Sequence, residues 1–291
     1  MKYRAPTSID EAVELLSAHP GAAVFAGATD LIPQIQGGRP EPSLVVDLKR
    51  IPETVRLESE NGFWRVGAAI PAAALTAHAG LSAAFPGLVE GAGLIGSDQI
   101  QGRATLGGNL CHASPAADSV PPLVALGAEA IIVGPGGERS APVSEVVIGP
   151  GATSLDRAEF ITEFRIPSPS RWSSDAYQRF IPRTEMDIAV AGAAARIRVD
   201  SDGRCEEAAV VLAAVAPTVV EVSAASGILE GRLIPHDSGR DAFWDELGEA
   251  VVSCCNPIDD KRGTAEYRRQ VAQVLARRTV VTAARRARQN P

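Results

Sequence analysis

The sequence predicts an α+β protein made of three consecutive units. Short helical and strand patterns alternate in residues 1–55, and strand patterns bracket alanine-rich helical stretches in residues 56–175. Two long strand patterns and one long helical pattern follow in residues 176–291. A chain of 291 residues with 45% hydrophobic residues can fill more than one core, so a single domain is not expected.

The first unit begins with a capped helix. The stretch Thr7-Ser8 offers a capping side chain and acidic residues occupy the following turn, so we expect a helix from about Ser8 to Ala18. Pro20-Gly21 ends this helix. Strands are expected at 22–26 and 44–48, and the first of them runs directly into a turn of small residues.

The middle unit is predicted to be α+β. Strands are expected at 64–68, 130–133 and 160–166, and the last of them stops at a proline. A helix is expected from Ser119 to Leu126. The proline-rich and serine-rich stretch at 167–171 has the composition of a linker.

The third unit is predicted to combine a hairpin with a helix. Strands are expected at 190–199 and 208–216, joined by the turn-forming residues 200–203. A helix follows from Thr264 to Arg288, with apolar residues on one face and many arginines elsewhere. This basic run is either a solvated face or a docking surface for an acidic partner subunit.

Composition excludes several classes of function. A net charge of -7 and a pI of about 5.2 argue against nucleic-acid binding. No apolar stretch has the roughly 18 residues of a membrane span, and the N-terminus is too polar for a signal peptide, so we expect a soluble cytoplasmic protein. The cysteines, Cys111, Cys205, Cys254 and Cys255, include no C-x-x-C pair, so no metal site is predicted and reduced thiols are expected.

Two glycine-containing loops, at 26–31 and 105–110, are the most informative short segments. The residues at their centres lack bulky side chains, so their backbone N–H groups can turn toward an anion such as a diphosphate. Neither loop fits the dinucleotide fingerprint G-x-G-x-x-G or the P-loop. Each loop taken alone fits an ordinary tight turn better than a phosphate-binding site.

These loops resemble a known family. AGATDLIP at 26–33 and GRATLGGNLCHASPAAD at 102–118 are similar to the two flavin loops of the medium subunit of molybdenum hydroxylases. That family includes carbon monoxide dehydrogenase, the β subunit of 4-hydroxybenzoyl-CoA reductase and the flavin domain of xanthine dehydrogenase. Residues 177–191 and 263–269 also resemble it, so the similarity covers nearly the whole chain in the expected order.

The resemblance implies a fold and a cofactor, FAD. The fold is a two-part FAD-binding domain of the vanillyl-alcohol oxidase type, with subdomains at 1–55 and 56–175. A C-terminal domain with a small antiparallel sheet and helices would occupy 176–291. The implied cofactor-binding residues are Ala26, Gly27, Ala28, Thr29, Asp30, Leu31, Thr105, Gly107, Gly108, Asn109, His112, Ser114, Asp118, Ile161 and Arg179.

Within that set the resemblance assigns different roles. Backbone groups of 26–30 and 105–109 wrap the diphosphate, and the acid Asp118 binds the cofactor's hydroxyls. Leu31 and Ile161 are the apolar neighbours of the isoalloxazine, while His112 and Ser114 line the cavity and Arg179 lies close to the ring. Residues 180–189 match a loop that changes position in the xanthine enzymes.

Some assignments stay open, and the chain departs from the family at two positions. Asp118 is also placed to cap the helix after it, and His112 is either a base or a cavity-lining residue. Ala28 replaces a more usual glycine or asparagine, and Arg179 replaces a frequent lysine. No cysteine-rich insertion follows Asn109, so no additional cluster is expected in this chain.

The implied function is an oxidoreductase subunit with no catalytic residue of its own. It would receive electrons from [2Fe–2S] clusters on a small partner, while a large partner binds the molybdenum cofactor, and it would pass them to an external acceptor. A dimer of such heterotrimers is expected. The alternatives are a self-contained flavin oxidoreductase of the vanillyl-alcohol oxidase type, with a covalent link at His112 or Cys111, and a scaffold subunit that has lost its flavin. Neither the substrate nor the acceptor follows from the sequence.

Overall fold

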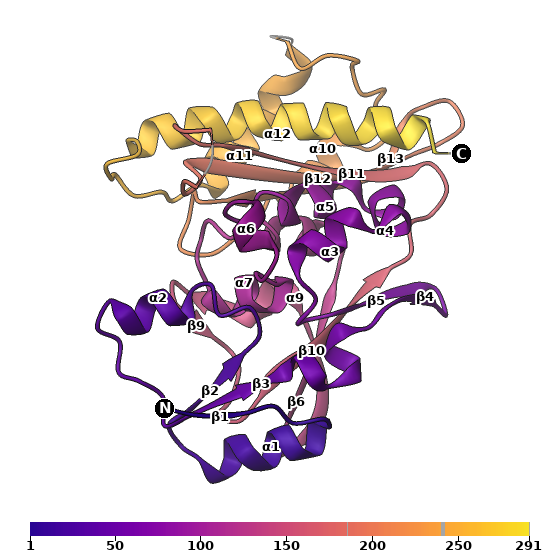
Figure 1. Cartoon of the computed structure of the whole chain (residues 1–291). Coiled ribbons are helices and arrows are strands. Elements are labelled where there is room, and N and C mark those ends of the chain that lie inside the picture. The colour runs from indigo at the N-terminus through magenta and orange to yellow at the C-terminus, as the bar shows by residue number, and fades with distance from the viewer. Residues whose placement is uncertain (185, 240–241, 291) are drawn as a thin grey trace.

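The computed structural model describes residues 1–184, 186–239 and 242–290, and it confirms the α+β class. Three main sheets follow one another along the chain, from the parallel sheet near the N-terminus to a four-stranded sheet beneath the long helix α12 (Figure 1). A two-stranded pair, β8 and β9, completes the strands of the described residues. The first two sheets lie within residues 1–55 and 56–175, whereas the third sheet begins with β11 at Ser173, before the predicted start of the last segment at residue 176.

The N-terminal sheet is parallel, in the order β1-β3-β2. The predicted helix and both predicted strands are confirmed, and the Ser8 side chain accepts a hydrogen bond from the Glu11 N–H at 3.2 Å, as a cap should. The elements are β1 (Lys2–Arg4), α1 (Ile9–Ala18), β2 (Ala22–Phe25), α2 (Leu31–Gln36), β3 (Leu44–Asp47), η1 (Leu48–Arg50) and η2 (Pro52–Val55).

The middle sheet is antiparallel, in the order β4-β5-β10-β6-β7, and all three predicted strands are present in it. Its central strand β10 comes last in the chain, so this sheet is complete only when the chain reaches residue 167. The elements are β4 (Leu57–Glu60), β5 (Phe63–Gly67), α3 (Ala72–Ala77), α4 (Ala79–Ala84), α5 (Pro86–Ala92), α6 (Asp98–Gln101), α7 (Leu106–His112), α8 (Val120–Ala125), β6 (Glu129–Gly134), β7 (Gly137–Pro142), α9 (Val143–Val146), β8 (Val147–Gly149), β9 (Ala152–Thr153) and β10 (Phe160–Pro167).

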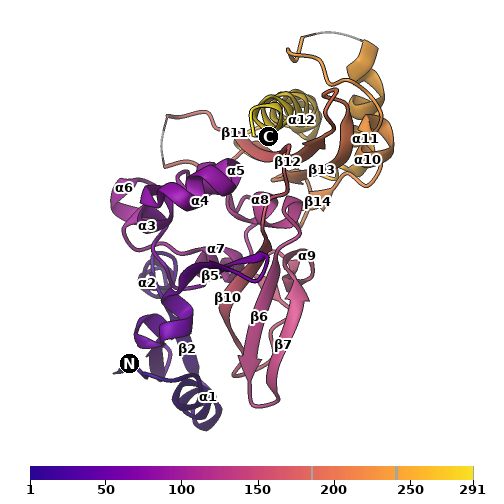
Figure 2. The same cartoon turned by 90° about the vertical axis from the view of Figure 1, so that its right-hand side faces the viewer.

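The C-terminal sheet, in the order β11-β12-β13-β14, has helices on both faces. Helix α12 covers one face, while α5 and α8 of the preceding domain reach the other (Figure 2). The predicted hairpin and long helix are confirmed. The elements are β11 (Ser173–Phe180), β12 (Ala191–Val199), β13 (Cys205–Ala213), β14 (Val220–Glu221), α10 (Ala225–Leu229), η3 (Ala242–Trp244), α11 (Asp245–Cys254) and α12 (Ala265–Arg288).

Two strands of this sheet differ from the sequence-based prediction. Strand β13 ends at Ala213 instead of residue 216, because Ala214 has a left-handed φ of 61°. Strand β11 was not predicted, since it begins with Ser173, Ser174 and Asp175, which are poor strand formers. All three are nevertheless buried, because this part of β11 lies beneath α5.

The contact between α5 and β11 joins the two domains, and the backbones of the two elements touch directly. A Cβ on Gly87 would lie 2.6 Å from the Ala176 nitrogen, so only glycine permits this approach. The carboxylate of Asp175 accepts a hydrogen bond from the Leu88 N–H at 2.9 Å and thereby satisfies a donor in the first turn of α5. A strand of one domain therefore caps a helix of the other.

Charged side chains extend this junction to α12. The Glu90 carboxylate accepts a hydrogen bond from the Tyr177 N–H at 2.9 Å and forms an ion pair with Arg286. Arg286 also donates to the Asp175 carbonyl at 2.9 Å. Helix α12 is thus fastened to the sheet and, through Glu90, to the domain on the far side of it.

Candidate cofactor-binding site

A cavity of about 560 Å³ lies where the two predicted loops meet. Twelve of the fifteen predicted site residues line it, so segments about 80 residues apart in the chain form one concave surface. These twelve are Ala26, Gly27, Ala28, Thr29, Asp30, Leu31, Thr105, Gly107, Gly108, Asn109, His112 and Ile161.

The loops are in direct backbone contact. A Cβ on Gly27 would lie 2.0 Å from the Arg103 carbonyl oxygen, a distance that no side chain allows. The Arg103 guanidinium donates a hydrogen bond back to the Gly27 carbonyl at 3.1 Å. Gly27 is therefore a requirement of the contact between the loops, in addition to being part of a turn.

Lys49 holds the start of the first loop. Its Nζ donates to the Ala26 carbonyl at 2.9 Å and forms an ion pair with Asp47 at 2.7 Å. Burial alone would raise the Asp47 pKa, but hydrogen bonds from Lys49 and Tyr3 outweigh that effect and lower the pKa. Asp47 is therefore ionised at neutral pH and keeps Lys49 in position beneath the loop.

The amide groups of the first loop are free. Among the described residues, no hydrogen bond uses the N–H groups of Gly27, Ala28, Thr29 or Asp30. The Ala28 carbonyl accepts from the Ile32 N–H at 3.1 Å and so starts α2, while the carbonyls of Ala26 and Gly27 bind Lys49 and Arg103. Consecutive free N–H groups at a cavity wall are suited to bind phosphate oxygens.

Ala28 has the backbone conformation that makes this arrangement possible. Its φ of 61° is left-handed, a region where alanine is strained relative to glycine by about 1 kcal/mol. The sequence shows only that Ala28 departs from the glycine or asparagine usual in the family. The structure shows that the loop accepts the Cβ in a left-handed turn.

The second loop is fixed by a helix cap and a close backbone contact. The Thr105 hydroxyl accepts from the Gly108 N–H at 2.9 Å and caps α7. The Gly107 N–H donates to the Ala68 carbonyl at 3.1 Å, and a Cβ on Gly107 would lie 2.7 Å from that same oxygen. Gly107 thus lets the loop lie against the end of the middle sheet.

Polar side chains at the cavity wall have partners within the protein. The Asn109 side-chain oxygen accepts from the Ser119 hydroxyl at 2.7 Å, so Asn109 also positions the start of α8. His112 Nδ1 lies 3.4 Å from Gln34 Nε2 and 3.9 Å from Asp30 Oδ1. His112 therefore lies in the cavity wall among polar neighbours, in the place that the second of its two interpretations gives it.

The remaining predicted residues lie outside the cavity lining. Asp118 pairs with Arg179 and accepts a hydrogen bond from the Tyr177 hydroxyl at 2.7 Å, and it is 6% exposed. This cluster joins the segment before α8 to β11 of the C-terminal domain. The Ser114 hydroxyl accepts locally from the Ala116 N–H at 3.2 Å.

The surroundings of Asp118 decide whether it caps the helix that follows it. Burial raises its pKa to about 6, although Arg179 and Tyr177 act in the opposite direction. Ser119 occupies the N-cap of α8 and no side chain caps that helix, so the capping interpretation of Asp118 was wrong. Its contact with cofactor hydroxyls, and that of Arg179 with the ring, stay predictions.

Several lining residues carried no sequence signal. Gln34 and Arg39 follow the first loop and are in contact with each other, while Phe25, Leu155 and Phe160 add apolar surface beside Ile161. No motif marks these positions. Their place in the wall results from the way β2, β10 and the segment after β9 meet in three dimensions.

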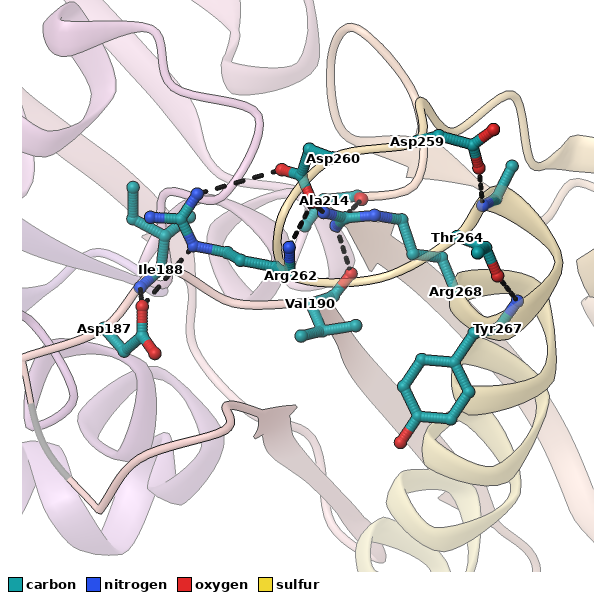
Figure 3. A network of polar contacts seen from close by, with 11 residues as sticks. Asp187, Ile188, Val190, Ala214, Asp259, Asp260, Arg262, Thr264, Tyr267 and Arg268 are labelled. Atoms are coloured by element: carbon teal, nitrogen blue, oxygen red, sulfur yellow. Dashed lines mark hydrogen bonds and ion pairs between the residues drawn. The ribbon is translucent and has the colours of Figure 1, made fainter.

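The segment at 180–189, apart from residue 185, which lies outside the described residues, is closed at its base by the Val190 N–H, which donates to the Phe180 carbonyl at 2.8 Å. Figure 3 shows Arg268 between the carbonyls of Val190 and Ala214, with hydrogen bonds of 2.6 and 3.2 Å. Arg262 forms an ion pair with Asp187 at 3.4 Å. The end of this segment is thus tied to α12 and the loop before it.

Two family models match the chain. The FAD binding domain in molybdopterin dehydrogenase matches residues 1–169, and the CO dehydrogenase flavoprotein C-terminal domain matches residues 176–283. The chain is an FAD-binding medium subunit of the molybdenum hydroxylase family. The resemblance seen in the two loops is therefore confirmed over the whole chain, and FAD is the cofactor of this medium subunit.

Individual relatives are similar over their full length. The medium subunit is 31% identical to subunit alpha of the 6-hydroxypseudooxynicotine dehydrogenase complex of Paenarthrobacter nicotinovorans, covering 98% of this chain and 95% of the relative. It is 32% identical to the carbon monoxide dehydrogenase medium chain of Afipia carboxidovorans, covering 98% and 97%. A chain of the CO dehydrogenase structure from Oligotropha carboxidovorans superposes with a TM-score of 0.91 at 30% identity and 98% coverage of both chains.

Two further observations concern the described part of this medium subunit. None of its helices is both long and apolar enough to cross a membrane. It also contains no grouping of three or more histidine, cysteine, aspartate or glutamate side chains that could hold a metal ion.

Proposed function

We propose that this medium subunit transfers electrons within a molybdenum-containing complex. It receives them from [2Fe–2S] clusters of a small partner subunit and passes them to an external acceptor, while the organic substrate reacts on a large molybdopterin-binding partner. The names of its relatives support this proposal, since they include the medium chain of carbon monoxide dehydrogenase and a subunit of a dehydrogenase complex.

The observation that carries the proposal is the row of four free amides at the cavity. The N–H groups of residues 27–30 have no acceptor among the described residues, so they can donate hydrogen bonds to the diphosphate oxygens of FAD. Because Gly27 and Gly107 have no Cβ, both loops can lie in direct contact with neighbouring backbone, and together they form one cavity wall. Leu31 and Ile161 give the same cavity an apolar part, where we place the isoalloxazine.

The roles of the residues are binding and positioning. FAD, when bound, supplies the redox chemistry, because it accepts electrons singly and releases them in pairs. Thr105 and Lys49 fix the two loops, and His112 with Asp30 and Gln34 forms a polar wall at the α2 side of the cavity. No residue of this medium subunit is assigned a proton transfer on the organic substrate.

The proposal is tested with the isolated chain and with the complete complex. The isolated chain, reconstituted with FAD, should show flavin absorbance and should not oxidise the organic substrate of the complex. In the complete complex, substrate should bleach the flavin absorbance, and removal of molybdenum should abolish that bleaching. Substrate turnover by the isolated, molybdenum-free chain would contradict the proposal.

A further inference from the structure

Helix α12 has a charge opposite to that of the whole chain. It contains seven arginines and one glutamate over 24 residues, whereas the net charge of the chain is -7. Its inner face, which includes Ala272, Leu275 and Ala283, is buried against the sheet, and α11 lies along one flank (Figure 2). The outer face points away from the sheet.

Five of the seven arginines of α12 fall into two groups, and the first group is used inside the protein; the other two, Arg269 and Arg277, are half-buried. Arg268 binds the carbonyls of Val190 and Ala214, and Arg286 binds Glu90. Arg288 donates to the Ile234 carbonyl at 2.7 Å. These side chains fasten the helix to its own domain and to the junction, so the fold accounts for them.

The second group has no such use. Arg278 and Arg285 are exposed, and neither forms an ion pair with any described residue. They are seven residues apart, so they lie on the same face of the helix, about 10 Å from each other. The acidic residues of this chain are therefore not neutralising this pair, although the chain has more acids than bases.

The spacing of the other outer residues points to a contact with another protein. Tyr267, Val274, Arg278 and Arg285 follow one another at intervals of seven, four and seven residues, while Val271 and Val281 between them pack in part against the core beneath the helix. This is the spacing by which one helix presents a continuous stripe to a partner. Tyr267, which is 42% exposed, also packs edge-on against Phe180, which is 37% exposed, with ring centroids 6.1 Å apart.

We propose that the outer face of α12, from the Phe180–Tyr267 pair to Arg285, docks on an acidic surface of a partner subunit. Exposed aromatic residues and arginine are the types most enriched in protein interfaces. A second copy of this chain docked through the same stripe would offer Arg278 and Arg285 no acidic partner, because the stripe contains no aspartate or glutamate. The occupant is therefore a different, acidic protein, whose existence rests on the proposed function.

The test uses the double variant Arg278→Glu/Arg285→Glu in the complex, with the chain co-expressed with its molybdopterin-binding and [2Fe–2S] subunits. The control is Arg50→Glu, a reversal at an exposed arginine of the N-terminal domain. The complex is purified, and the affinity of the variant chain for the other two subunits is measured at low and high salt. We expect the double variant to bind about 10-fold more weakly or worse and to lose salt dependence, while the control binds like the wild type.

Flavin content and melting temperature of the double variant should equal those of the wild type, because both side chains are exposed. Assembly of the double variant with unchanged affinity and salt dependence would overturn the docking proposal alone. Loss of binding to phosphatidylserine vesicles with unchanged assembly would also overturn it, by assigning the face to a membrane. A wild-type chain that binds FAD but never assembles with the two subunits would overturn the proposed function as well.

Discussion

The cavity and the domain junction use polar groups in opposite ways. At the cavity, the N–H groups of residues 27–30 have no partner within the described protein, and the loop that bears them is held from behind by Lys49 and Arg103. At the junction, Asp118 pairs with Arg179 and Glu90 pairs with Arg286. Binding capacity thus comes from backbone groups left free on small-residue turns, whereas cohesion between domains comes from side chains that satisfy each other.

The largest effect is expected from breaking the buried pair at the junction. Arg179→Met leaves the Asp118 carboxylate buried without its cation, which should lower the free energy of unfolding by about 3–5 kcal/mol. Chemical denaturation measures this loss. The double variant Asp118→Asn/Arg179→Met should recover much of it, because no charge is then left alone.

The same variants show whether Arg179 serves the junction alone or also the cofactor site. FAD affinity of Arg179→Met, measured by flavin fluorescence, should change far less than stability if the pair belongs only to the junction. If this variant keeps its stability but binds FAD much more weakly, Arg179 belongs to the cofactor site, as the family resemblance implies.

A substitution at Gly27 should change stability less than Arg179→Met does, but it should weaken FAD binding more. The Cβ of Gly27→Ala would collide with the Arg103 carbonyl, and relieving this contact should cost about 1–3 kcal/mol and separate the loops. FAD should then bind at least about 10-fold more weakly, a change of about 1.4 kcal/mol. A variant that binds FAD like the wild type would show that the contact between the loops is not needed.

The adjacent residue provides a matched control. Ala28→Gly relieves a left-handed alanine, so it should leave FAD binding intact, and the relief of strain should offset much of the entropy that glycine adds to the unfolded chain. Two single-methyl changes at neighbouring positions should therefore have very different effects on the cofactor.

The smallest effect is expected from the pH dependence of the junction. Burial raises the pKa of Asp175 to about 7, above its ordinary value of 3.8. The folded state therefore favours the protonated acid, and the stability gained from it is complete below about pH 4 and is lost as the pH rises through 7. The free energy of unfolding should fall by at most about 1.4 kcal/mol for each pH unit in this range.

Asp175→Asn removes this titration. Its melting temperature should vary less between pH 4 and 8 than that of the wild type, and thermal unfolding across this range measures the difference. The hydrogen bond to the Leu88 N–H remains possible through the amide oxygen, so the cap of α5 is retained. Parallel pH curves for the two proteins would show that Asp175 does not titrate in this range.

Sequence patterns predicted the parts of the fold that depend on neighbours in the chain. The capped start of α1, the hairpin across residues 200–203 and the long helix α12 were all predicted because local residue types determine them. Strand β11 was missed because the burial of Asp175 depends on α5, which lies 87 residues earlier in the chain. The same limit applies to the site, where the loops were predicted and Gln34, Arg39 and Phe160 were not.

The order in which the sheets are completed has a consequence for synthesis on the ribosome. Once residue 167 has emerged, every strand of the cofactor-binding domain is available, so this part can become compact during translation. The sheet that follows lacks its cover until α12, which ends at Arg288, leaves the exit tunnel. A ribosome that stalls late would therefore expose the side of β11 and β12 that α12 covers to chaperones, while the flavin loops are already formed.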